Sequence, residues 1–189
     1  KWQSLQLLAA YGLPIPSTSY IGELVECSSQ LVLHFPSVVL KTLVGMQGTG
    51  VELYEETNTA LNKLKMLKQV GEKALVQDFI AETRGQDIRA FVIGDQVAAS
   101  MQRTAGNGDF RANLHQGGKA ESIELTEEEK QIAIQATKAI GLDVAGVDLI
   151  RTKQGPMILE VNASPGLEGI ETVSGKDIAG MMVDYLLGI

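Results

Sequence analysis

The chain has 189 residues, 44% of them hydrophobic, which is enough for one good-sized core or for two small lobes that share a cleft. Its formal net charge of −7 argues against nucleic acid as the main partner, because a phosphate backbone binds to a basic face. It has neither a bilayer-spanning apolar stretch nor a visible signal peptide, and its single cysteine, Cys27, fits a reducing compartment such as the cytoplasm.

The first 80 residues alternate between helical and strand patterns. The opening "KWQSLQLLAAYGLP" has apolar residues at helical spacing followed by glycine and proline, which predicts an amphipathic helix. Because the chain starts inside this helix and without methionine, we expect a fragment of a longer protein. The pattern further predicts a strand over 37–43, a helix over 57–69 capped by Thr57 or Asn58, and a strand over 74–80.

The next segment predicts a β-hairpin followed by a long loop. Residues 86–103 alternate as two strands do, and Gly94-Asp95 supplies a tight turn between them. The loop over 104–118 is polar, and a loop of this length inside a compact domain is usually functional.

The remaining residues predict a helix, a second hairpin and a last helix. Thr126 and Glu129 form a capping box at the start of a helix. The second hairpin is predicted over 144–163 and the last helix over 175–187. Since strands pair in hairpins and alternate with helices, we predict an α+β fold. We assign a small lobe to about 20–80 and a larger lobe to about 81–189.

Polar side chains gather at the end of the second hairpin. With a turn over 153–155, the ladder would place Asp148 opposite Glu160, whereas a two-residue turn would place Asp148 against Leu159. Side chains alternate along a strand, so Asn162 shares a face with Glu160. Like charges directly opposite each other are destabilising unless a positive group offsets them.

This pattern has two interpretations. Two carboxylates and an amide oxygen, without nearby Cys or His, suit Mg²⁺ or Mn²⁺, and Gly146 opposite Asn162 would leave space. The alternative is a solvated strand edge with incidental acids. Mg²⁺ held by few carboxylates usually also binds substrate phosphates, so the first interpretation predicts a nucleotide site.

Phosphate-binding candidates lie on both sides of the predicted lobe boundary. Lys41 ends a strand before a glycine-rich stretch (Gly45, Gly48, Gly50), whose backbone N–H groups could approach a phosphate, although a glycine-containing turn explains it equally. Arginine suits bidentate recognition of phosphate or carboxylate, and surface charge is the alternative. The basic set on the first hairpin and its loop is Arg89, Arg103 and Arg111, with Asn113 and His115 beside them.

The sequence resembles the RimK-type α-L-glutamate ligases of the ATP-grasp superfamily. The resemblance rests on "DVAGVDLI…GPMILEVNASPGLEGIE…GKDIAG" and extends through "VVLKTLVGMQGTGV", "LVQDFI" and "GDFRANLHQGG" over essentially the whole chain. It implies an ATP-grasp fold in which two α+β lobes hold ATP. It also implies that the family's N-terminal domain is missing from this chain.

The resemblance assigns roles to individual residues. It implies ATP contacts, two Mg²⁺ or Mn²⁺ ions, and arginines that face the reacting carboxylate. The implied ATP-binding residues are Lys41, Gly48, Asp78, Phe79, Asp87, Arg111, Ala112 and Asn113; the metal ligands are Asp148, Glu160 and Asn162; the catalytic arginines are Arg103 and, beside it, Arg89.

The sequence departs from the family pattern in two loops. The glycine loop reads "VGMQGTG" where relatives often have "EGTQGIG", so an acidic residue is lost. The stretch "MQRTAGNGDF" stands where relatives have two adjacent arginines and an acid, which affects acceptor binding.

The resemblance implies an ATP-dependent ligase that adds L-glutamate, or a similar amino acid, to a peptide or protein C-terminus through an acyl phosphate. The acceptor of the name-giving family members is a ribosomal protein, and relatives form tetramers. Two alternatives stay open at this point. One is an ATP-grasp ligase for another small-molecule acceptor, and the other is an ATP-binding module without turnover.

Overall fold

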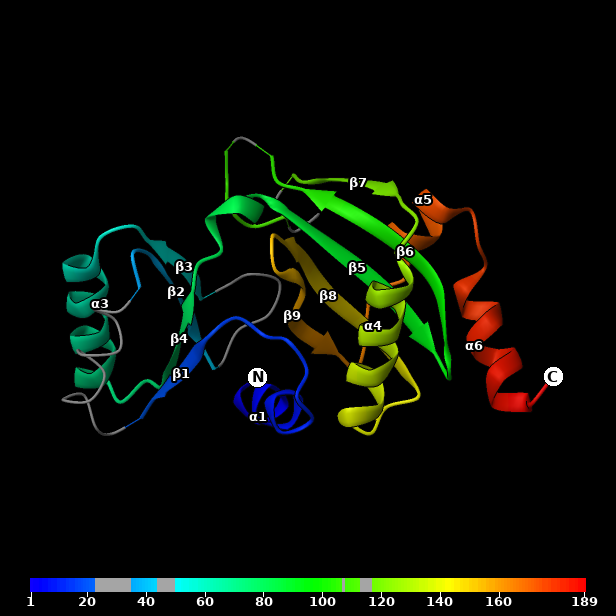
Figure 1. Cartoon of the computed structure of the whole chain (residues 1–189), viewed down its shortest axis with the longest axis horizontal. Coiled ribbons are helices and arrows are strands. Elements are labelled where there is room, and N and C mark those ends of the chain that lie inside the picture. The colour runs from blue at the N-terminus through cyan, green and yellow to red at the C-terminus, as the bar shows by residue number, and fades with distance from the viewer. Residues whose placement is uncertain (23–34, 44–49, 107, 113–116) are drawn as a thin grey trace. The chain divides into compact units, whose positions relative to one another are not determined.

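The computed structural model describes residues 1–22, 35–43, 50–106, 108–112 and 117–189. Its elements form two compact units, and the chain enters each of them more than once (Figure 1). The first unit comprises Lys1–Trp2 and Pro16–Ala81, and the second comprises Gln3–Ile15 and Glu82–Ile189. Within the described ranges, no helix has both the length and the apolar character needed to cross a membrane.

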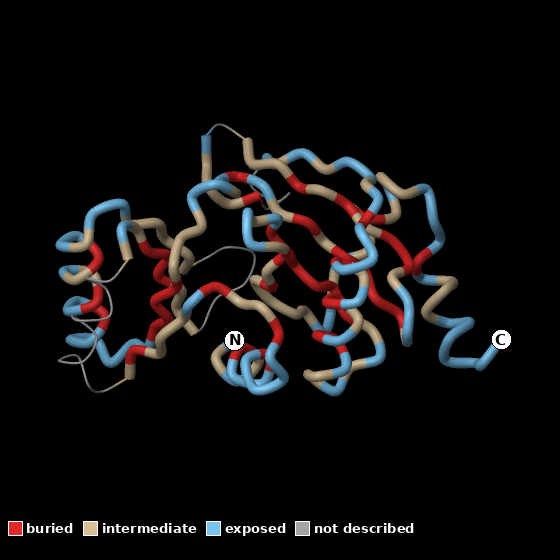
Figure 2. The backbone as a smooth tube through the Cα atoms, in the orientation of Figure 1, coloured by how far each residue is buried: buried red, intermediate tan, exposed pale blue. Residues whose placement is uncertain are grey.

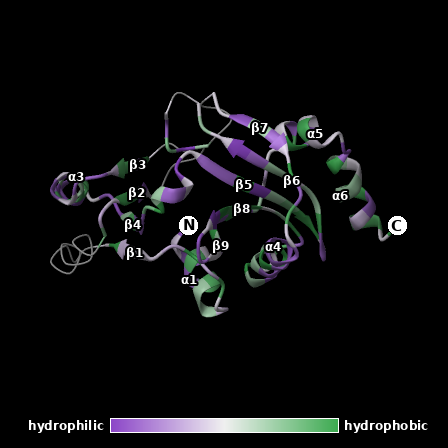
Figure 3. Cartoon of the chain, turned by 45° about the horizontal axis from the view of Figure 1, so that its top comes forward, coloured by the Kyte–Doolittle hydropathy of each residue, from purple (hydrophilic) through white to green (hydrophobic). Residues whose placement is uncertain are grey.

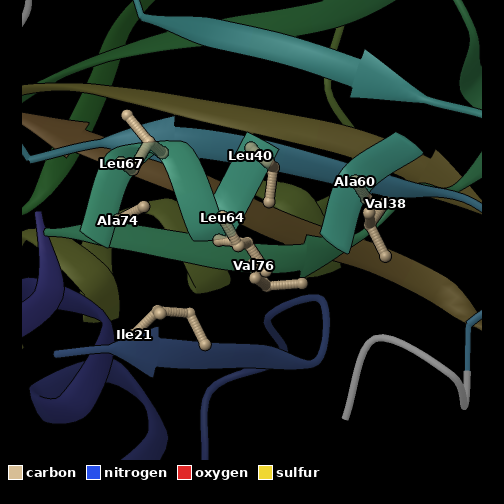
Figure 4. Close-up of a cluster of buried hydrophobic side chains, with 8 residues drawn as sticks. All are labelled: Ile21, Val38, Leu40, Ala60, Leu64, Leu67, Ala74 and Val76. Carbon is tan, nitrogen blue, oxygen red and sulfur yellow. The ribbon is translucent and has the colours of Figure 1, made fainter. Parts of the chain in front are cut away.

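The first unit is an antiparallel sheet packed against one helix. The strands follow the order β1-β4-β2-β3. Their bounds are β1 Thr18–Ile21, β2 Val38–Thr42, β3 Val51–Tyr54 and β4 Ala74–Asp78, and the helix is α3 Thr57–Gln69. Alternate residues of β2 and β4 point to α3 and meet Ala60, Leu64 and Leu67, which recur at helical spacing (Figure 4). This apolar cluster is the core of the unit.

The second unit is a larger antiparallel sheet with helices against it. The strands follow the order β7-β6-β5-β8-β9. Their bounds are β5 Gln86–Ile93, β6 Gln96–Thr104, β7 Lys119–Ser122, β8 Val144–Thr152 and β9 Gly155–Asn162. The helical elements are α1 Trp2–Ala10, η1 Ala81–Thr83, α4 Glu127–Ala139, α5 Glu168–Ser174 and α6 Ile178–Leu187. The central strands β5 and β8 are mostly buried (Figure 2).

Helix α4 and helices α5 and α6 cover different faces of this sheet. Hydrophobic and hydrophilic residues alternate around α4 (Figure 3), and its buried Glu129 pairs with Arg151 of β8. Odd-numbered β8 residues therefore face α4, and Asp148 points to the opposite face. On that face Phe91 packs with Ile170 and Ile178 of α5 and α6.

Several sequence predictions are confirmed. The α+β class is right, and the helix over 57–69 and the strands near 37–43 and 74–80 are present. The turn of the first hairpin is Gly94-Asp95, because Ile93 pairs with Gln96. The predicted capping box of α4 also forms, with both hydrogen bonds between Thr126 and Glu129.

Two predictions about helix starts are wrong. The N-cap of α3 is Glu56, without a side-chain capping bond, so neither Thr57 nor Asn58 caps the helix. The predicted last helix is present but begins at Ile178 rather than at Gly175, because Asp177 is the N-cap of α6 and accepts a hydrogen bond from the Gly180 N–H. Asp177 thereby satisfies a backbone donor that the first helical turn leaves open.

Candidate active site

The candidate active site is a row of polar side chains on one face of the second unit's sheet. Alternation places Asp87 and Arg89 of β5 on the face that also carries Asp148 of β8. The β5–β6 ladder pairs Asp87 with Arg103, and the β8–β9 ladder pairs Asp148 with Glu160. The row therefore brings two arginines and three carboxylates together across four adjacent strands.

The pairing of Asp148 with Glu160 is confirmed, but the predicted turn is wrong. Thr152 pairs with Gly155, so the turn has two residues rather than three. A regular ladder from this turn would place Asp148 opposite Leu159. The register instead shifts by one between Asp148 and Leu149, because Leu159 is an extra residue in β9. This β-bulge brings Glu160 to the face of Asp148.

Asn162 occupies the predicted position beyond Glu160. It pairs with Gly146, and its Nδ2 donates to the Gly146 carbonyl oxygen at 3.4 Å. The sequence had suggested open space above Gly146, but this space is occupied. A Cβ built on Gly146 would lie 2.7 Å from Cβ of Pro165. Glycine is therefore needed so that the chain after β9 can fold back over the sheet.

Two arginines bind the Asp148 carboxylate. Arg89 Nε and Nη2 donate to its two oxygens at 2.7 and 2.8 Å. Arg103 Nη2 lies 2.9 Å from Asp148 Oδ2. Asp148 and Arg103 are 5% and 3% exposed, so these ion pairs are shielded from water. The positive charge predicted opposite Asp148 is thus supplied, in this structure, by two guanidinium groups.

Asp87 is the second carboxylate that holds Arg103. Its two oxygens accept from Arg103 Nε and Nη2 at 2.6 and 2.7 Å. Arg103 therefore lies between two carboxylates and makes a bidentate pair with one of them. Such pairs fix both the position and the plane of the guanidinium.

Burial and charge set the pKa values of these groups. Burial raises the pKa of Asp148, but the charges and hydrogen bonds of Arg103 and Arg89 outweigh burial and hold the pKa below its ordinary value. At Asp87 burial prevails over Arg103 and raises the pKa to about 6, with a further increase from the charge of Asp148. Burial lowers the pKa of Arg103, but both carboxylates outweigh it, and the net pKa is raised.

Glu160 differs from Asp148 in having no cationic partner. It is half-buried and makes no hydrogen bond or ion pair with the residues that the structure describes. Asn162 Oδ1 has no partner in this part of the chain either. Asp148 Oδ1 accepts a single hydrogen bond and retains a lone pair. These oxygen donors fit Mg²⁺ or Mn²⁺.

The amide is essential to this donor set. Among the described residues, no three side chains of His, Cys, Asp or Glu form a group that could hold a metal ion. A site on this face therefore consists of two carboxylates, of which one is already shared with arginines, and Asn162. Such a site needs substrate oxygens to complete its coordination.

Arg111 lies in the second unit, in the segment between β6 and β7. Its Nη2 lies 2.8 Å from Asp109 Oδ2, and its guanidinium is 5.6 Å from the centre of the Phe110 ring. The hydrogen bond from Arg111 lowers the pKa of Asp109. Ala112 is buried, and the predicted contact Asn113 lies outside the described residues, as does His115.

The remaining predicted nucleotide contacts lie in the first unit. Lys41 is half-buried on β2, and Gly48 lies outside the described residues. The N–H groups of Asp78 and Phe79 donate to the carbonyl oxygens of Ser17 and Ser37 at 2.9 and 3.2 Å. Neither N–H group is thus available to a nucleotide base in this conformation.

The sequence prediction missed the partners of its own candidates. Asp87 was assigned to the nucleotide without a protein partner, and in this structure its two oxygens accept hydrogen bonds from Arg103. Asp109 and Pro165 were not assigned at all. The signal for Asp109 was present, because an acid two residues before Arg111 in a loop can reach the same side of a tight turn. Pro165 is positioned by a close approach to Gly146 that no spacing pattern encodes.

Comparisons with known proteins identify the family of this chain. The RimK-like ATP-grasp domain matches residues 1–186. The chain is 56% identical over 186 residues to the probable alpha-L-glutamate ligase of Haemophilus influenzae (strain ATCC 51907 / DSM 11121 / KW20 / Rd). The match covers 98% of this chain but only 62% of that relative.

Solved structures show the same fold. The ATP-grasp ligase PsnB complexed with precursor peptide PsnA2 and AMPPNP superposes with a TM-score of 0.79 at 25% identity, over 100% of this chain and 58% of that one. The same ligase complexed with minimal precursor, Mg and ADP gives a TM-score of 0.78 at 25% identity, over 97% and 56% of the two chains.

Proposed function

Because the chain belongs to the RimK-like ATP-grasp family, we propose that its protein is an ATP-dependent carboxylate–amine ligase. The acceptor that we propose is the C-terminal carboxylate of a peptide or protein, and the added amino acid is L-glutamate. The family match and the relative named probable alpha-L-glutamate ligase support the proposal, as does the peptide bound to PsnB.

The observation that carries the proposal is the charge row on the second unit's sheet. Arg89 and Arg103 bind Asp148, and the carboxylate of Glu160, opposite Asp148 on β9, has no ion pair with any described residue. The Nη1 groups of the two arginines make no hydrogen bond with the described residues, so each arginine keeps donors for an anion. A face with both anion-binding donors and cation-binding oxygens suits a reaction between a carboxylate and a metal-bound nucleoside triphosphate.

The reaction has two balanced steps. A carboxylate oxygen of the acceptor attacks the γ-phosphorus of ATP, the bond from phosphorus to the bridging oxygen breaks, and ADP leaves. The amine of glutamate then attacks the acyl carbon, the carbon–oxygen bond of the acyl phosphate breaks, and phosphate leaves as the amine loses a proton to solvent. Phosphoryl transfer depends mainly on positioning and on charge stabilisation.

We assign each group of residues to one part of this reaction according to its chemistry. Arg103 and Arg89 hold and neutralise the acceptor carboxylate, which otherwise repels the triphosphate. We assign Lys41 and Arg111 to the phosphates of ATP. Asp148, Glu160 and Asn162 would hold Mg²⁺ or Mn²⁺, which supplies further neutralisation of phosphate charge when bound.

A turnover assay tests the proposal. ADP release would be measured with Mg²⁺, ATP and L-glutamate, with and without a short peptide that ends in glutamate. The assay would be run on this chain and on the protein extended to the length of its relatives. The proposal expects ADP release that requires both glutamate and peptide. ATP binding without ADP release in both proteins would instead identify a nucleotide-binding module.

A further inference from the structure

Strand β7 is the outermost strand of the second unit's sheet (Figure 1). Among the described residues, it pairs over Lys119–Ser122 with β6 and with no other strand. An edge strand leaves half of its backbone N–H and C=O groups without a ladder partner. The opposite edge of the sheet differs, because the N–H of Ile158 in β9 donates to the carbonyl oxygen of Pro14 at 2.8 Å.

The register shows which backbone groups of β7 point outward. The N–H of Ile123 donates to the carbonyl oxygen of Ser100 at 3.4 Å, one step beyond the last ladder pair. Bonded and unbonded pairs alternate in an antiparallel ladder, so the backbone of Glu121 also faces β6. The N–H and C=O groups of Ala120 and Ser122 therefore point away from the sheet. They make no hydrogen bond with the described residues.

One end of this edge leads to the charge row. Ala120 lies opposite Arg103 in the register, near the start of β7. Toward the other end of β6, the same face is filled by an apolar cluster that includes Ala99 and Ile170. Lys119, which begins β7, is exposed and makes no ion pair with the described residues. A positive charge at this end suits the arrival of a peptide's carboxylate terminus.

The distance from the edge to the arginine determines how much of a peptide would leave the ladder. A strand added beyond β7 would lie two strand spacings, about 10 Å, from the strand that carries Arg103. About four extended residues, at about 3.3 Å each, cover this distance and leave the terminal carboxylate at the guanidinium. The residues that precede these four would then lie beside β7.

We propose that the outward edge of β7 binds the acceptor peptide as an added antiparallel strand. Antiparallel pairing brings the C-terminus of the peptide to the Lys119 end of β7, whereas parallel pairing would bring its N-terminus there. The main chain of the peptide supplies the affinity through hydrogen bonds to Ala120 and Ser122. The inference rests on the proposed function, because it takes the acceptor to be a peptide whose C-terminal carboxylate reaches Arg103.

Backbone N-methylation of the acceptor peptide tests the added strand. Eight-residue peptides that end in glutamate would each carry one N-methyl group, which removes one N–H donor, and the unmethylated peptide is the control. Each would be measured for kcat and KM with the protein extended to the length of its relatives. Methylation should raise KM about fivefold to tenfold at two positions separated by one residue, near the fifth and the seventh from the C-terminus. At the position between them it should change KM by less than about twofold, because that N–H points away from β7.

Amide hydrogen exchange measures the same pairing on the protein. With the unmethylated peptide bound, the N–H groups of Ala120 and Ser122 should exchange about tenfold more slowly or less. The N–H of Glu121 is the internal control, because it already faces β6. The variant Ala120→Pro removes one outward donor and no ladder bond, so it should raise the KM of the peptide about fivefold and keep the Kd of ATP within about threefold. The methylated peptides are tested on the wild type, so their result does not depend on the folding of this variant.

Two results would overturn the inference while leaving the proposed function in place. One is turnover of the peptide with a flat N-methylation series and unchanged exchange at Ala120 and Ser122. The other is a rise in KM at consecutive methylated positions, which would show contacts without strand pairing. Absence of turnover with every peptide would refute the proposed function instead. The exchange rates of Ala120 and Ser122 with the peptide present would then decide whether this edge binds it.

Discussion

Asp148 and Glu160 lie directly opposite each other across β8 and β9, but among the described residues only Asp148 has cationic partners. Arg89 and Arg103 neutralise Asp148, which is almost completely buried, while Glu160 on the neighbouring strand keeps its charge uncompensated by any described residue. The two carboxylates thus differ in their surroundings. Asp148 stabilises the arginine row, and we propose Glu160 as a cation ligand together with Asn162 and the remaining lone pair of Asp148.

Substitution of the two carboxylates separates these roles. Asp148→Asn removes the buried negative charge that Arg89 and Arg103 share. It therefore lowers the free energy of unfolding by about 3 kcal/mol or more. Glu160→Gln changes it by less than about 1 kcal/mol, but lowers Mg²⁺-dependent ADP release by about a hundredfold. Urea unfolding measures the change in unfolding free energy, and the ADP assay measures the change in Mg²⁺-dependent ADP release. Equal stability losses in the two variants would contradict the distinction.

Gly146 controls the chain that follows β9. In Gly146→Ala the new methyl group would lie 2.7 Å from Cβ of Pro165 and 3.6 Å from Nε of Arg89, so the rigid proline must move. We expect a loss of about 1–3 kcal/mol in unfolding free energy and a weaker affinity for the acceptor peptide. Gly166→Ala is the matched control, because its Cβ would have no neighbour within 4 Å. Similar effects of both substitutions would refute the contact with Pro165 as the cause.

The raised pKa of Asp87 predicts a specific pH dependence. The folded protein binds this proton more tightly than the unfolded chain, since burial raises the pKa from 3.8 to about 6. Ionisation of Asp87 therefore opposes folding, and its contribution to the unfolding free energy decreases as pH rises from about 4 to about 6. Asp148 acts in the opposite direction, but at lower pH, because its pKa is lowered and its stabilisation is lost below 3.8.

Urea unfolding of wild type and Asp87→Asn between pH 4 and 7 measures this contribution. The unfolding free energy of the wild type minus that of the variant should fall as pH rises through this window and level off above about pH 6. Parallel pH curves for the two proteins would show that Asp87 does not titrate in this range.

Gly94 lies under the ring of Tyr185 at the turn of the first hairpin. Its φ is +59°, and a built Cβ would lie 2.5 Å from the Tyr185 ring. Gly94→Ala should cost the strain of a positive φ, about 1 kcal/mol, and also displace the ring whose hydroxyl donates to Asp143. Gly141→Ala, with a φ of +77° and no neighbour within 4 Å, reports the strain alone.

A second background isolates the contact with the ring. In Tyr185→Ala, the cost of Gly94→Ala in unfolding free energy should fall to that of Gly141→Ala. An unchanged cost in this background would show that the ring is not what the methyl group meets.

Local signals in the sequence predicted the elements that local chemistry determines. The two-residue turn at Gly94-Asp95 and the capping box of Thr126 and Glu129 depend on neighbours along the chain, and both are confirmed. The short strands β1, β3 and β7 and the helix α5 were missed. Each has few residues, and the strands form where a neighbouring strand offers hydrogen bonds, which no pattern within four residues shows.

The candidate site depends on two irregularities that sequence alone does not place. A regular first hairpin would pair Asp87 with Gln102, and a register shift between Phe91 and Val92 pairs it with Arg103 instead. The bulge at Leu159 acts in the same way on Glu160. The residue types were predictable from alternation and charge, but their partners were not, because one extra residue in a strand changes every later pair.

The central claim is that the protein activates an acceptor carboxylate as an acyl phosphate, and isotope transfer tests it most directly. The acceptor peptide would carry ¹⁸O in its C-terminal carboxylate, and ³¹P NMR would read the isotope shift of the phosphate released with Mg²⁺, ATP and L-glutamate. The account predicts one ¹⁸O atom in each phosphate, because the attacking carboxylate oxygen stays with phosphorus when the amide forms. Unlabelled phosphate would show that water attacks ATP, and would contradict the account.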